Sequence, residues 1–267
     1  TDSEVDREAT ELRREEAEEL VGGLLDVQLH YPDLSHAPFD TAVRMRGLEA
    51  ILMDALDAPE KVRELMDAIT SGYERHHRAR EGSGRVNLHL SRDGRYAAVG
   101  FRVHCAYARE GAASSPELAD EWAYVSAQTS SGFGPDMFAD LVHPYNARLA
   151  RLYPRNTVYF HGCERLDEKL DVLATLPHLR RFHVSPWSSV RAAVAKLRGS
   201  VVLEVHAHPG KVFFGATRED MRRELRGLLD EAEGHPLDLN LSDIHSVGGD
   251  PRLLTIWAEE AQAASGR

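Results

Sequence analysis

The sequence predicts an α/β protein built on a parallel β-sheet, close to a (β/α)8 TIM barrel. Two observations carry this prediction. From Trp122 onward, short apolar runs alternate regularly with amphipathic helical patterns, and patterns of about 10 to 18 residues are long enough to cross over a sheet in βαβ units. Right-handed crossovers then place the C-terminal ends of all strands on one rim. In this class of protein that rim contains the functional site.

The strand patterns fall in seven segments, whereas a closed barrel of this type has about eight strands. They cover residues 24–31, 86–90, 123–128, 157–161, 179–184, 200–206 and 237–241. The stretch from Ser91 to Ser115 contains strand-like residues and a loop-like GAASSP, and it is assigned no element. A barrel that is incomplete at its N-terminal strand is therefore part of the prediction.

Helical spacing of apolar residues predicts the remaining elements. The first helix is expected at 3–20, with Asp2 or Ser3 as its N-cap. Two helices are expected between Thr41 and Glu74, separated at Pro59, and the polar stretch 76–85 is expected to be a solvated connector. Further helices are expected at 135–153, 165–176, 188–197, 218–231 (with Thr217 as N-cap) and 250–264, with a helical turn at 117–122.

The composition excludes several classes of protein. With 267 residues, 42% hydrophobic and 28% charged, the chain is large and apolar enough to bury a sizeable core. We expect a single domain, in which residues 1–40 supply a helix and the first strand and residues 41–267 form the barrel. The 43 acidic and 32 basic residues give a net charge of −11, which argues against nucleic acid or an anionic membrane as the main partner.

The sequence also predicts a cytoplasmic location. No apolar run approaches the roughly 18 residues of a membrane span, and the acidic N-terminal segment shows no signal-peptide pattern. Two cysteines, Cys105 and Cys163, do not make a disulfide framework.

The segment TVYFHGC, residues 157–163, carries the most informative chemistry. Its β-branched and aromatic run ends in His161 and Cys163, and residues two apart along a strand share a face. An imidazole and a thiol placed together suit a borderline-soft ion such as zinc. The alternative is that His161 is a hydrogen-bonded polar residue beside a small packed cysteine.

A catalytic zinc ion usually has three protein ligands and one open position, so a third ligand is needed. The strand that ends in LEVHAHPG places Glu204, His206 and His208 on one face. We therefore predict that His206, His208 or both complete the metal site. The alternative is that these histidines bind a substrate carboxylate or hydrogen-bond to loop carbonyls.

The order of several segments resembles the uroporphyrinogen decarboxylase superfamily, which also contains the zinc-dependent methylcobalamin:thiol methyltransferases. Together the similar segments span most of the chain from residue 40 onward. They are MRGLEAILMDALDAPEKVRELMDAI (45–69), WAYVSAQTSSGFGPDMFADLVHPYNARL (122–149), VYFHGCERLDEKLDVLATLPHLRRFHVSP (158–186) and PLDLNLSDIHSVGGDPRLLTIW (236–257). The resemblance implies a (β/α)8 barrel with its site at the C-terminal rim. It also makes His161 and Cys163 similar to the His-x-Cys zinc element of the methyltransferases.

The chain departs from the family pattern in two places. It begins close to the family's second or third strand, so the substrate-binding arginines of the decarboxylases have no counterpart. A homo-oligomer or a partner chain that completes the barrel is therefore expected. Near the C-terminus, Ser242 stands where the decarboxylases carry a functional His and the methyltransferases carry their last zinc-binding Cys. Its neighbours Asp243 and His245 are not the expected residues at that position.

The first functional hypothesis is an enzyme that transfers a methyl group from a corrinoid-type donor to a thiol. The cofactor would be zinc or another divalent transition metal at His161 and Cys163. A metal-bound thiol is deprotonated at neutral pH, and the thiolate is the nucleophile that accepts the methyl group. Gln128, at the end of AYVSAQ, is a rim candidate for orienting the substrate, and ordinary loop hydrogen bonding is its alternative role.

Two other functions stay open. A carboxy-lyase acting on a porphyrinogen-like tetrapyrrole needs a carboxylate that stabilises a protonated pyrrole, and Asp243 is the candidate, although it is also placed to cap the turn before GGDP. The net charge and the absent arginines weigh against that substrate. The third possibility is a non-catalytic module of the same fold that binds a partner or a small molecule.

Overall fold

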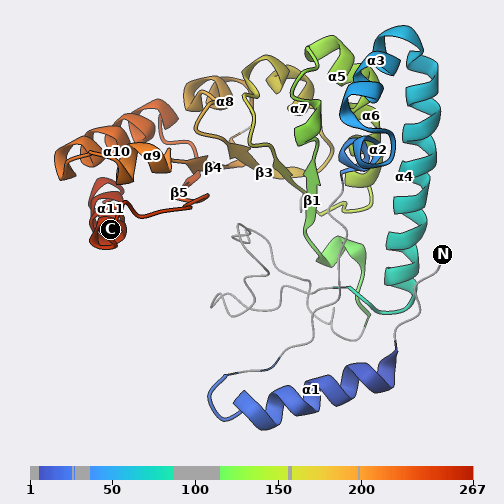
Figure 1. Cartoon of the computed structure of the whole chain (residues 1–267), viewed down its shortest axis with the longest axis horizontal. Coiled ribbons are helices and arrows are strands. Elements are labelled where there is room, and N and C mark those ends of the chain that lie inside the picture. Colours follow the sequence, from blue (N-terminus) through green and yellow to red (C-terminus); the bar gives the residue numbers. More distant parts are fainter. Residues whose placement is uncertain are drawn as a thin grey trace.

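A computed structural model describes residues 6–25, 27, 37–86, 115–155, 158–197 and 199–266. The described part is a mixed α/β fold around a five-stranded parallel sheet in the order β1-β2-β3-β4-β5 (Figure 1). Each strand pairs with the next one in the sequence, which is the order that successive βαβ units produce. The strands are β1 (Ala123–Ser126), β2 (Val158–His161), β3 (Leu179–Val184), β4 (Val202–His206) and β5 (Leu237–Asn240).

These strands confirm the last five strand predictions, with ends that differ by one or two residues or not at all. The predicted strands at 24–31 and 86–90 and the stretch from 91 to 115, with Cys105, fall almost wholly outside the described residues. Within the described ranges the sheet is open, because β1 and β5 form its two edges. The parallel α/β class is therefore confirmed, and closure into a barrel stays a prediction.

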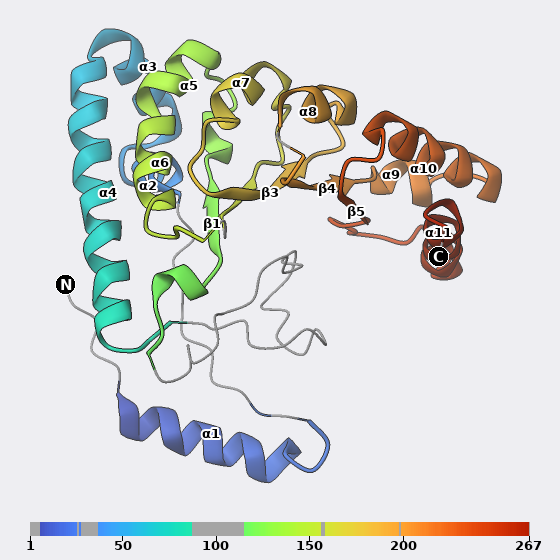
Figure 2. The ribbon, with the colours of Figure 1, turned by 180° about the vertical axis from the view of Figure 1, so that it is seen from behind.

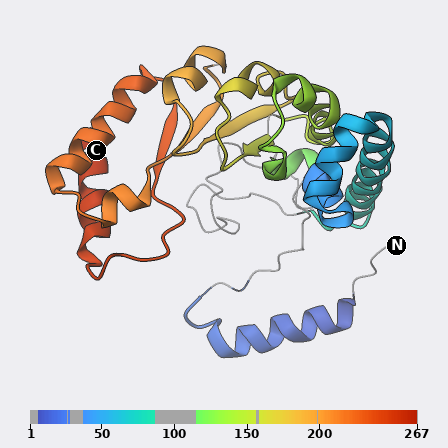
Figure 3. The same ribbon diagram turned by 45° about the horizontal axis from the view of Figure 1, so that its top comes forward.

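The helices cover one side of the sheet. Figure 3 shows the sheet as a curved layer with helices along its outer side. The α-helices are α1 (Arg7–Val21), α2 (Pro38–Arg46), α3 (Leu48–Asp57), α4 (Pro59–Gly82), α5 (Pro135–Leu141), α6 (His143–Ala150), α7 (Leu170–Leu173), α8 (Val190–Lys196), α9 (Pro209–Phe213), α10 (Arg218–Ala232) and α11 (Arg252–Ala264). Short 3-10 helices are η2 (Leu118–Asp120), η3 (Gln128–Ser130) and η4 (Asp167–Lys169).

Helix α1 stands apart from this arrangement. None of its residues is buried, and Figures 1 and 2 show it separated from the sheet and its helices. Its N-cap is Asp6, whose side chain accepts a hydrogen bond from the Ala9 amide at 2.9 Å. The predicted caps Asp2 and Ser3 were therefore wrong, since a cap directly precedes the first helical residue. Within the described residues, no helix has the length and apolar character of a membrane span.

Two helix predictions differ from the structure for identifiable reasons. The predicted helix 135–153 is divided into α5 and α6 at Val142, because Pro144 has no N–H to donate to Asp140 and its ring disfavours a continuous helix there. The predicted connector 76–85 was wrong, since α4 continues to Gly82. The Arg80 guanidinium is buried in this last part and forms two hydrogen bonds with the Glu121 carboxylate.

Alternate residues of the strands lie in two different environments. Val125, Phe160, Phe182 and Leu203 belong to the main apolar core beneath the helices, where the Phe160 and Phe182 rings stack at 5.8 Å. The other face of the same strands carries buried polar side chains. They are Tyr159 and His161 on β2, Arg181 and His183 on β3, and Glu204 and His206 on β4. Such a polar row inside a folded protein needs hydrogen-bond or ligand partners.

Candidate metal site

Three histidines lie side by side near the C-terminal ends of adjacent strands. His161 ends β2, His183 is the penultimate residue of β3 and His206 ends β4. All three are buried. Ring centroids are 4.2 Å apart between His161 and His183 and 4.1 Å apart between His183 and His206. Parallel pairing of the strands brings together residues that are more than 20 positions apart in the sequence.

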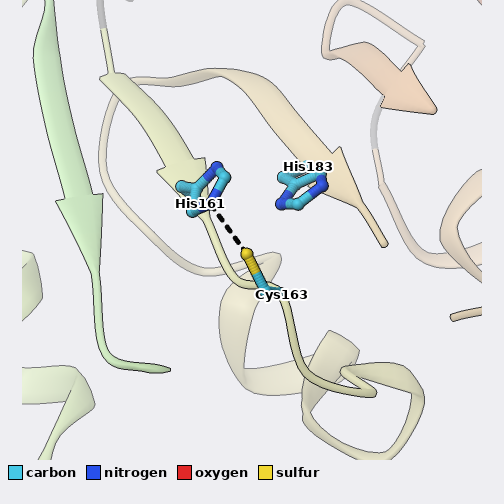
Figure 4. A group of neighbouring side chains, drawn as sticks. All are labelled: His161, Cys163 and His183. Carbon is cyan, nitrogen blue, oxygen red and sulfur yellow. Dashed lines mark hydrogen bonds between the residues drawn. The ribbon is translucent and has the colours of Figure 1, made fainter. Parts of the chain in front are cut away.

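His161, Cys163 and His183 form one group of potential ligands (Figure 4). The Nε2 atom of His161 lies 3.1 Å from the Cys163 sulfur, and the ligand atoms of the three residues lie within 4.8 Å of one another. Ligands of a tetrahedral zinc ion lie about 2.0 to 2.3 Å from the metal, so small side-chain movements would close this group around one ion. The predicted pair His161 and Cys163 is thus brought together, with an unpredicted third member.

Gly162 allows the turn that brings Cys163 back towards His161. A Cβ atom at this position would lie 3.0 Å from a Glu164 carboxylate oxygen and 3.0 Å from Leu166 Cδ1. Contacts of that length are shorter than normal packing allows. A larger residue between the two ligands would therefore push the Glu164 or Leu166 side chain aside by a few tenths of an ångström.

His183 is the residue that best fits a bound ligand. Both of its ring nitrogens are buried and have no hydrogen-bond partner among the described residues. Burial lowers the pKa of His183 to about 2, so the ring is neutral and keeps one unprotonated nitrogen. Leaving a buried polar group without a partner costs about 1 to 3 kcal/mol. A metal ion that accepts this lone pair would remove that cost, and the donor set fits such an ion.

A second group consists of His183, Glu204 and His206, whose ligand atoms also lie within 4.8 Å of one another. The Glu204 carboxylate already accepts hydrogen bonds from Arg181 Nε at 2.6 Å, from the Tyr159 hydroxyl at 2.8 Å and from His206 Nε2 at 2.8 Å. A second cation beside the Arg181 guanidinium would be repelled by it. The first group is therefore the better metal site.

His206 and His208 have other partners in this structure. The second ring nitrogen of His206, Nδ1, lies 2.6 Å from the Ser242 hydroxyl, so both nitrogens of His206 take part in hydrogen bonds. His208 is the N-cap of α9, where its Nδ1 accepts from the Gly210 amide, and its ring contacts Trp187 edge to face at 4.9 Å. His208 belongs to neither group of potential ligands. The structure brings His206 close to the site and favours His183 as the third ligand.

The surroundings of Cys163 keep its thiol protonated. Partial burial raises the pKa of Cys163 to about 11, and the negative charges of Asp243 and Glu164 contribute to the rise. Gln128, the first residue of η3, donates from Nε2 to the Cys163 sulfur at 3.4 Å. The predicted rim position of Gln128 is thus next to the site. Without a cation nearby, Cys163 is a weak nucleophile at neutral pH.

Asp243 lies at the same rim, in the turn after β5. Its backbone is in the left-handed region, with φ of 56°, which aspartate tolerates better than most residues. The side chain is exposed, and its negative charge favours protonation of both Cys163 and His161. Its predicted role as a catalytic carboxylate stays a prediction.

Sequence reasoning missed His183 as a site residue, although a signal was present. Two consecutive strands of the prediction carry the pair Phe-His, Phe160-His161 and Phe182-His183. In adjacent parallel strands, residues that follow a register pair lie side by side, and Phe160 pairs with Phe182. The repeated pair therefore indicates a histidine cluster.

Glu164 was also not predicted. Both of its carboxylate oxygens are buried without a hydrogen-bond partner among the described residues, and burial raises the pKa of Glu164 to about 7. Lys169 is also buried, and its ammonium group donates to the Ser130 carbonyl at 2.9 Å. A carboxyl group beside Cys163 that is close to half protonated at neutral pH distinguishes this rim from an ordinary solvated one.

The chain matches no protein-family model and no curated protein. The resemblance to the uroporphyrinogen decarboxylase superfamily therefore stays a prediction.

Proposed function

We propose that this chain is a metal-dependent enzyme that transfers a methyl group from a corrinoid-type donor to a thiol, with zinc held by His161, Cys163 and His183. The observation that carries the proposal is His183, a buried histidine without a hydrogen-bond partner among the described residues that faces His161 and Cys163. Zinc bound there would hold a substrate thiol as its thiolate at neutral pH.

The three residues leave room for that substrate. Three protein ligands leave one position of a tetrahedral site open, and Cys163 is reached by solvent whereas both histidines are buried. A substrate thiol would supply the fourth ligand. In the transfer, a sulfur lone pair forms the new C–S bond and the donor–carbon bond breaks with both electrons left on the donor. The thiol proton is released to solvent.

The apolar residues at the rim support a large donor. Trp187 follows β3, Phe214 lies after β4 and α9, and Ile244 follows β5, and all three side chains are exposed. A contiguous exposed apolar patch formed by such side chains would suit a bulky ligand. The site offers less to a polycarboxylated substrate. In the described part of the chain, the guanidinium that contacts the cluster is that of Arg181, and it is already paired with Glu204 and Asp238.

We also propose that the sheet belongs to a (β/α)8 barrel. The sequential strand order and the helices along one side of a curved sheet support this fold. The buried polar face, with the metal site at its C-terminal end, would then line the barrel interior.

The first experiment is elemental analysis of the purified protein and of variants that each remove one ligand. Wild type should contain close to one zinc per chain, and the Cys163→Ser, His161→Ala and His183→Ala variants should contain little. His208→Ala is the matched control, because it removes a rim histidine that has no place in the group. Its zinc content should equal that of wild type. A well-folded wild type without bound metal after zinc exposure would contradict the proposal.

The second experiment tests the transfer itself. Zinc-loaded protein is mixed with methylcobalamin and a small thiol, and demethylation is followed by the change in the corrinoid spectrum. The His183→Ala variant should lose at least about 100-fold in rate, because removal of a group that stabilises charge commonly costs 10²- to 10³-fold. Zinc binding without any thiol methylation would retain the metal site and reject the methyltransferase.

A further inference from the structure

A continuous chain of hydrogen bonds runs from Arg181 to the proposed metal site. Arg181 Nε donates to Glu204 Oε2 at 2.6 Å, and the Tyr159 hydroxyl donates to Glu204 Oε1 at 2.8 Å. The same hydroxyl lies 2.7 Å from His161 Nδ1. All four side chains of this hydrogen-bonded series are buried. Nε2 of His161 lies 3.1 Å from the Cys163 sulfur, so it is the atom that would bind zinc.

The protons of this hydrogen-bonded series can be placed by elimination. Glu204 is ionised, because a buried carboxylate in contact with a guanidinium is strongly favoured over the acid, and it can therefore only accept hydrogen bonds. The single hydroxyl proton of Tyr159 must then point to Glu204. The Tyr159 oxygen can only accept from His161, so the ring proton of His161 is on Nδ1. Nε2 is left with its lone pair.

We propose that Tyr159 and Glu204 are positioning residues that hold His161 in the tautomer with its proton on Nδ1, so that Nε2 is ready to bind a metal ion. This inference rests on the proposed metal site. Groups that hydrogen-bond to a ligating histidine commonly fix its tautomer and ring orientation in this way. Here the carboxylate acts through a tyrosine hydroxyl and is kept ionised by Arg181.

The same carboxylate orders a second histidine. His206 Nε2 lies 2.8 Å from Glu204 Oε1 and donates to it, because the ionised carboxylate can only accept, and His206 Nδ1 lies 2.6 Å from the Ser242 hydroxyl. Both ring nitrogens of His206 are therefore engaged in hydrogen bonds. Ser242, which stands where the resembling families carry a functional His or a zinc-binding Cys, thus contacts His206 and helps to hold its ring against Glu204.

The test reads the tautomer directly in metal-free protein. Nitrogen-15 NMR of the histidine rings distinguishes a protonated Nδ1 from a protonated Nε2, and assignment uses the His161→Ala variant. Wild type should show His161 with its proton on Nδ1. Imidazole side chains in water favour the proton on Nε2, and Tyr159→Phe should return His161 to that form, with Nε2–H pointing to Cys163.

The second readout is zinc affinity, measured by competition with a chelator. Tyr159→Phe and Glu204→Gln should each weaken zinc binding by about 10- to 100-fold, as is usual for loss of a group that supports a ligand. Tyr145→Phe is the matched control, because it loses one hydroxyl hydrogen bond, to the Arg63 carbonyl, far from the cluster. Its zinc affinity should equal that of wild type. Circular dichroism shows whether each variant is folded, and Tyr159→Phe is the decisive one if Glu204→Gln unfolds.

The outcomes separate this inference from the proposed function. Wild-type His161 with its proton on Nε2 would overturn the inference, and so would a Tyr159→Phe variant with unchanged tautomer and affinity. If wild type has the Nδ1 proton and loses it in Tyr159→Phe but binds no zinc, the positioning role stands and the metal site fails. Loss of both the tautomer and the affinity supports the two together.

Discussion

Arg80 and Glu121 form an ion pair inside the protein. Arg80 and Glu121 are both almost fully buried and are joined by contacts of 2.6 and 3.1 Å, with His77 Nδ1 also 3.2 Å from the guanidinium. The pair connects the last turns of α4 to the segment just before β1. Removing one member of a buried ion pair leaves the other charge without compensation.

Glu121→Gln should therefore destabilise the fold by about 3 kcal/mol. The glutamine keeps the size of the side chain and removes its charge, so the effect reports the loss of the Glu121 charge beside the buried Arg80. Urea unfolding followed by circular dichroism measures it. Glu64→Gln is the control, since Glu64 pairs with Lys61 on the surface, and it should change the stability by less than about 0.5 kcal/mol. Equal effects of the two variants would refute a buried role for Glu121.

A pH effect is expected at His143, the first residue of α6. Its Nε2 lies 2.9 Å from the Thr175 hydroxyl, and burial, with help from the charge of Arg151, lowers the pKa of His143 below its usual 6.5. The folded state then binds fewer protons than the unfolded state. This contribution to stability is complete above about pH 6.5 and is lost as the pH falls through the lowered pKa.

His143→Gln should remove that dependence. Between about pH 7.5 and pH 5, wild type should lose more stability than the variant, because only the histidine binds a proton more weakly in the folded state than in the unfolded state. Urea unfolding at both pH values gives the difference. A variant that loses stability as steeply as wild type would show that His143 does not titrate differently in the two states.

At the residue scale, the sequence predicted chemistry where residues were close in the chain. His161 and Cys163 lie on one strand end and were predicted together. His183 and Tyr159 are involved only because parallel pairing brings β2, β3 and β4 side by side. Arg80 and Glu121 are 41 positions apart, and a polar stretch such as 76–85 gives no sign that one of its charges is buried. The sequence does not show which distant residue each of these side chains contacts in the folded protein.

Elements were predicted best where local signals agree. Thr217 and Asp220 form a reciprocal capping box at the start of α10, with each side chain accepting from the other residue's amide. The apolar spacing of the following helix points to the same start. The break between α5 and α6 had a local signal in Pro144, which the continuous apolar spacing outweighed in the prediction.

Thr217→Ala should destabilise the protein by about 1 kcal/mol, because the amide of Asp220 loses its side-chain acceptor. Thr217→Ser keeps the hydroxyl and should remain within about 0.3 kcal/mol of wild type. Urea unfolding of the two variants makes the comparison. If alanine and serine behave alike, the cap contributes no stability and α10 is held only by its contacts with α11 and α8.

At the scale of the whole molecule, the regular alternation of strands and helices determines the parallel sheet, and the sheet determines where the polar side chains meet. The order β1 to β5 follows from short crossovers between neighbouring strands. Local sequence patterns do not predict how strongly the sheet curves or whether it closes, because both depend on how strands distant in the sequence pair. The position of the rim was thus predictable, and the full set of residues at the rim was not.

The proposed metal ion would join two strands, since His161 and Cys163 belong to the end of β2 and His183 to β3. Zinc that binds these ligands only when the strands are paired stabilises the folded state relative to the unfolded one. At a free zinc concentration of 100 times Kd the gain is about 2.7 kcal/mol. For a chain of this size the expected rise in Tm is roughly 5 to 10 °C.

Differential scanning fluorimetry with and without zinc tests this linkage on the whole fold. Wild type and His208→Ala should both show the rise, and Cys163→Ser and His183→Ala should not, because each lacks one ligand of the group. Magnesium should have no effect in any variant, since it prefers oxygen ligands. A zinc-dependent rise that persists in both ligand variants would place the ion elsewhere, and the buried His183, which has no hydrogen-bond partner in the described part of the chain, would then need a different ligand.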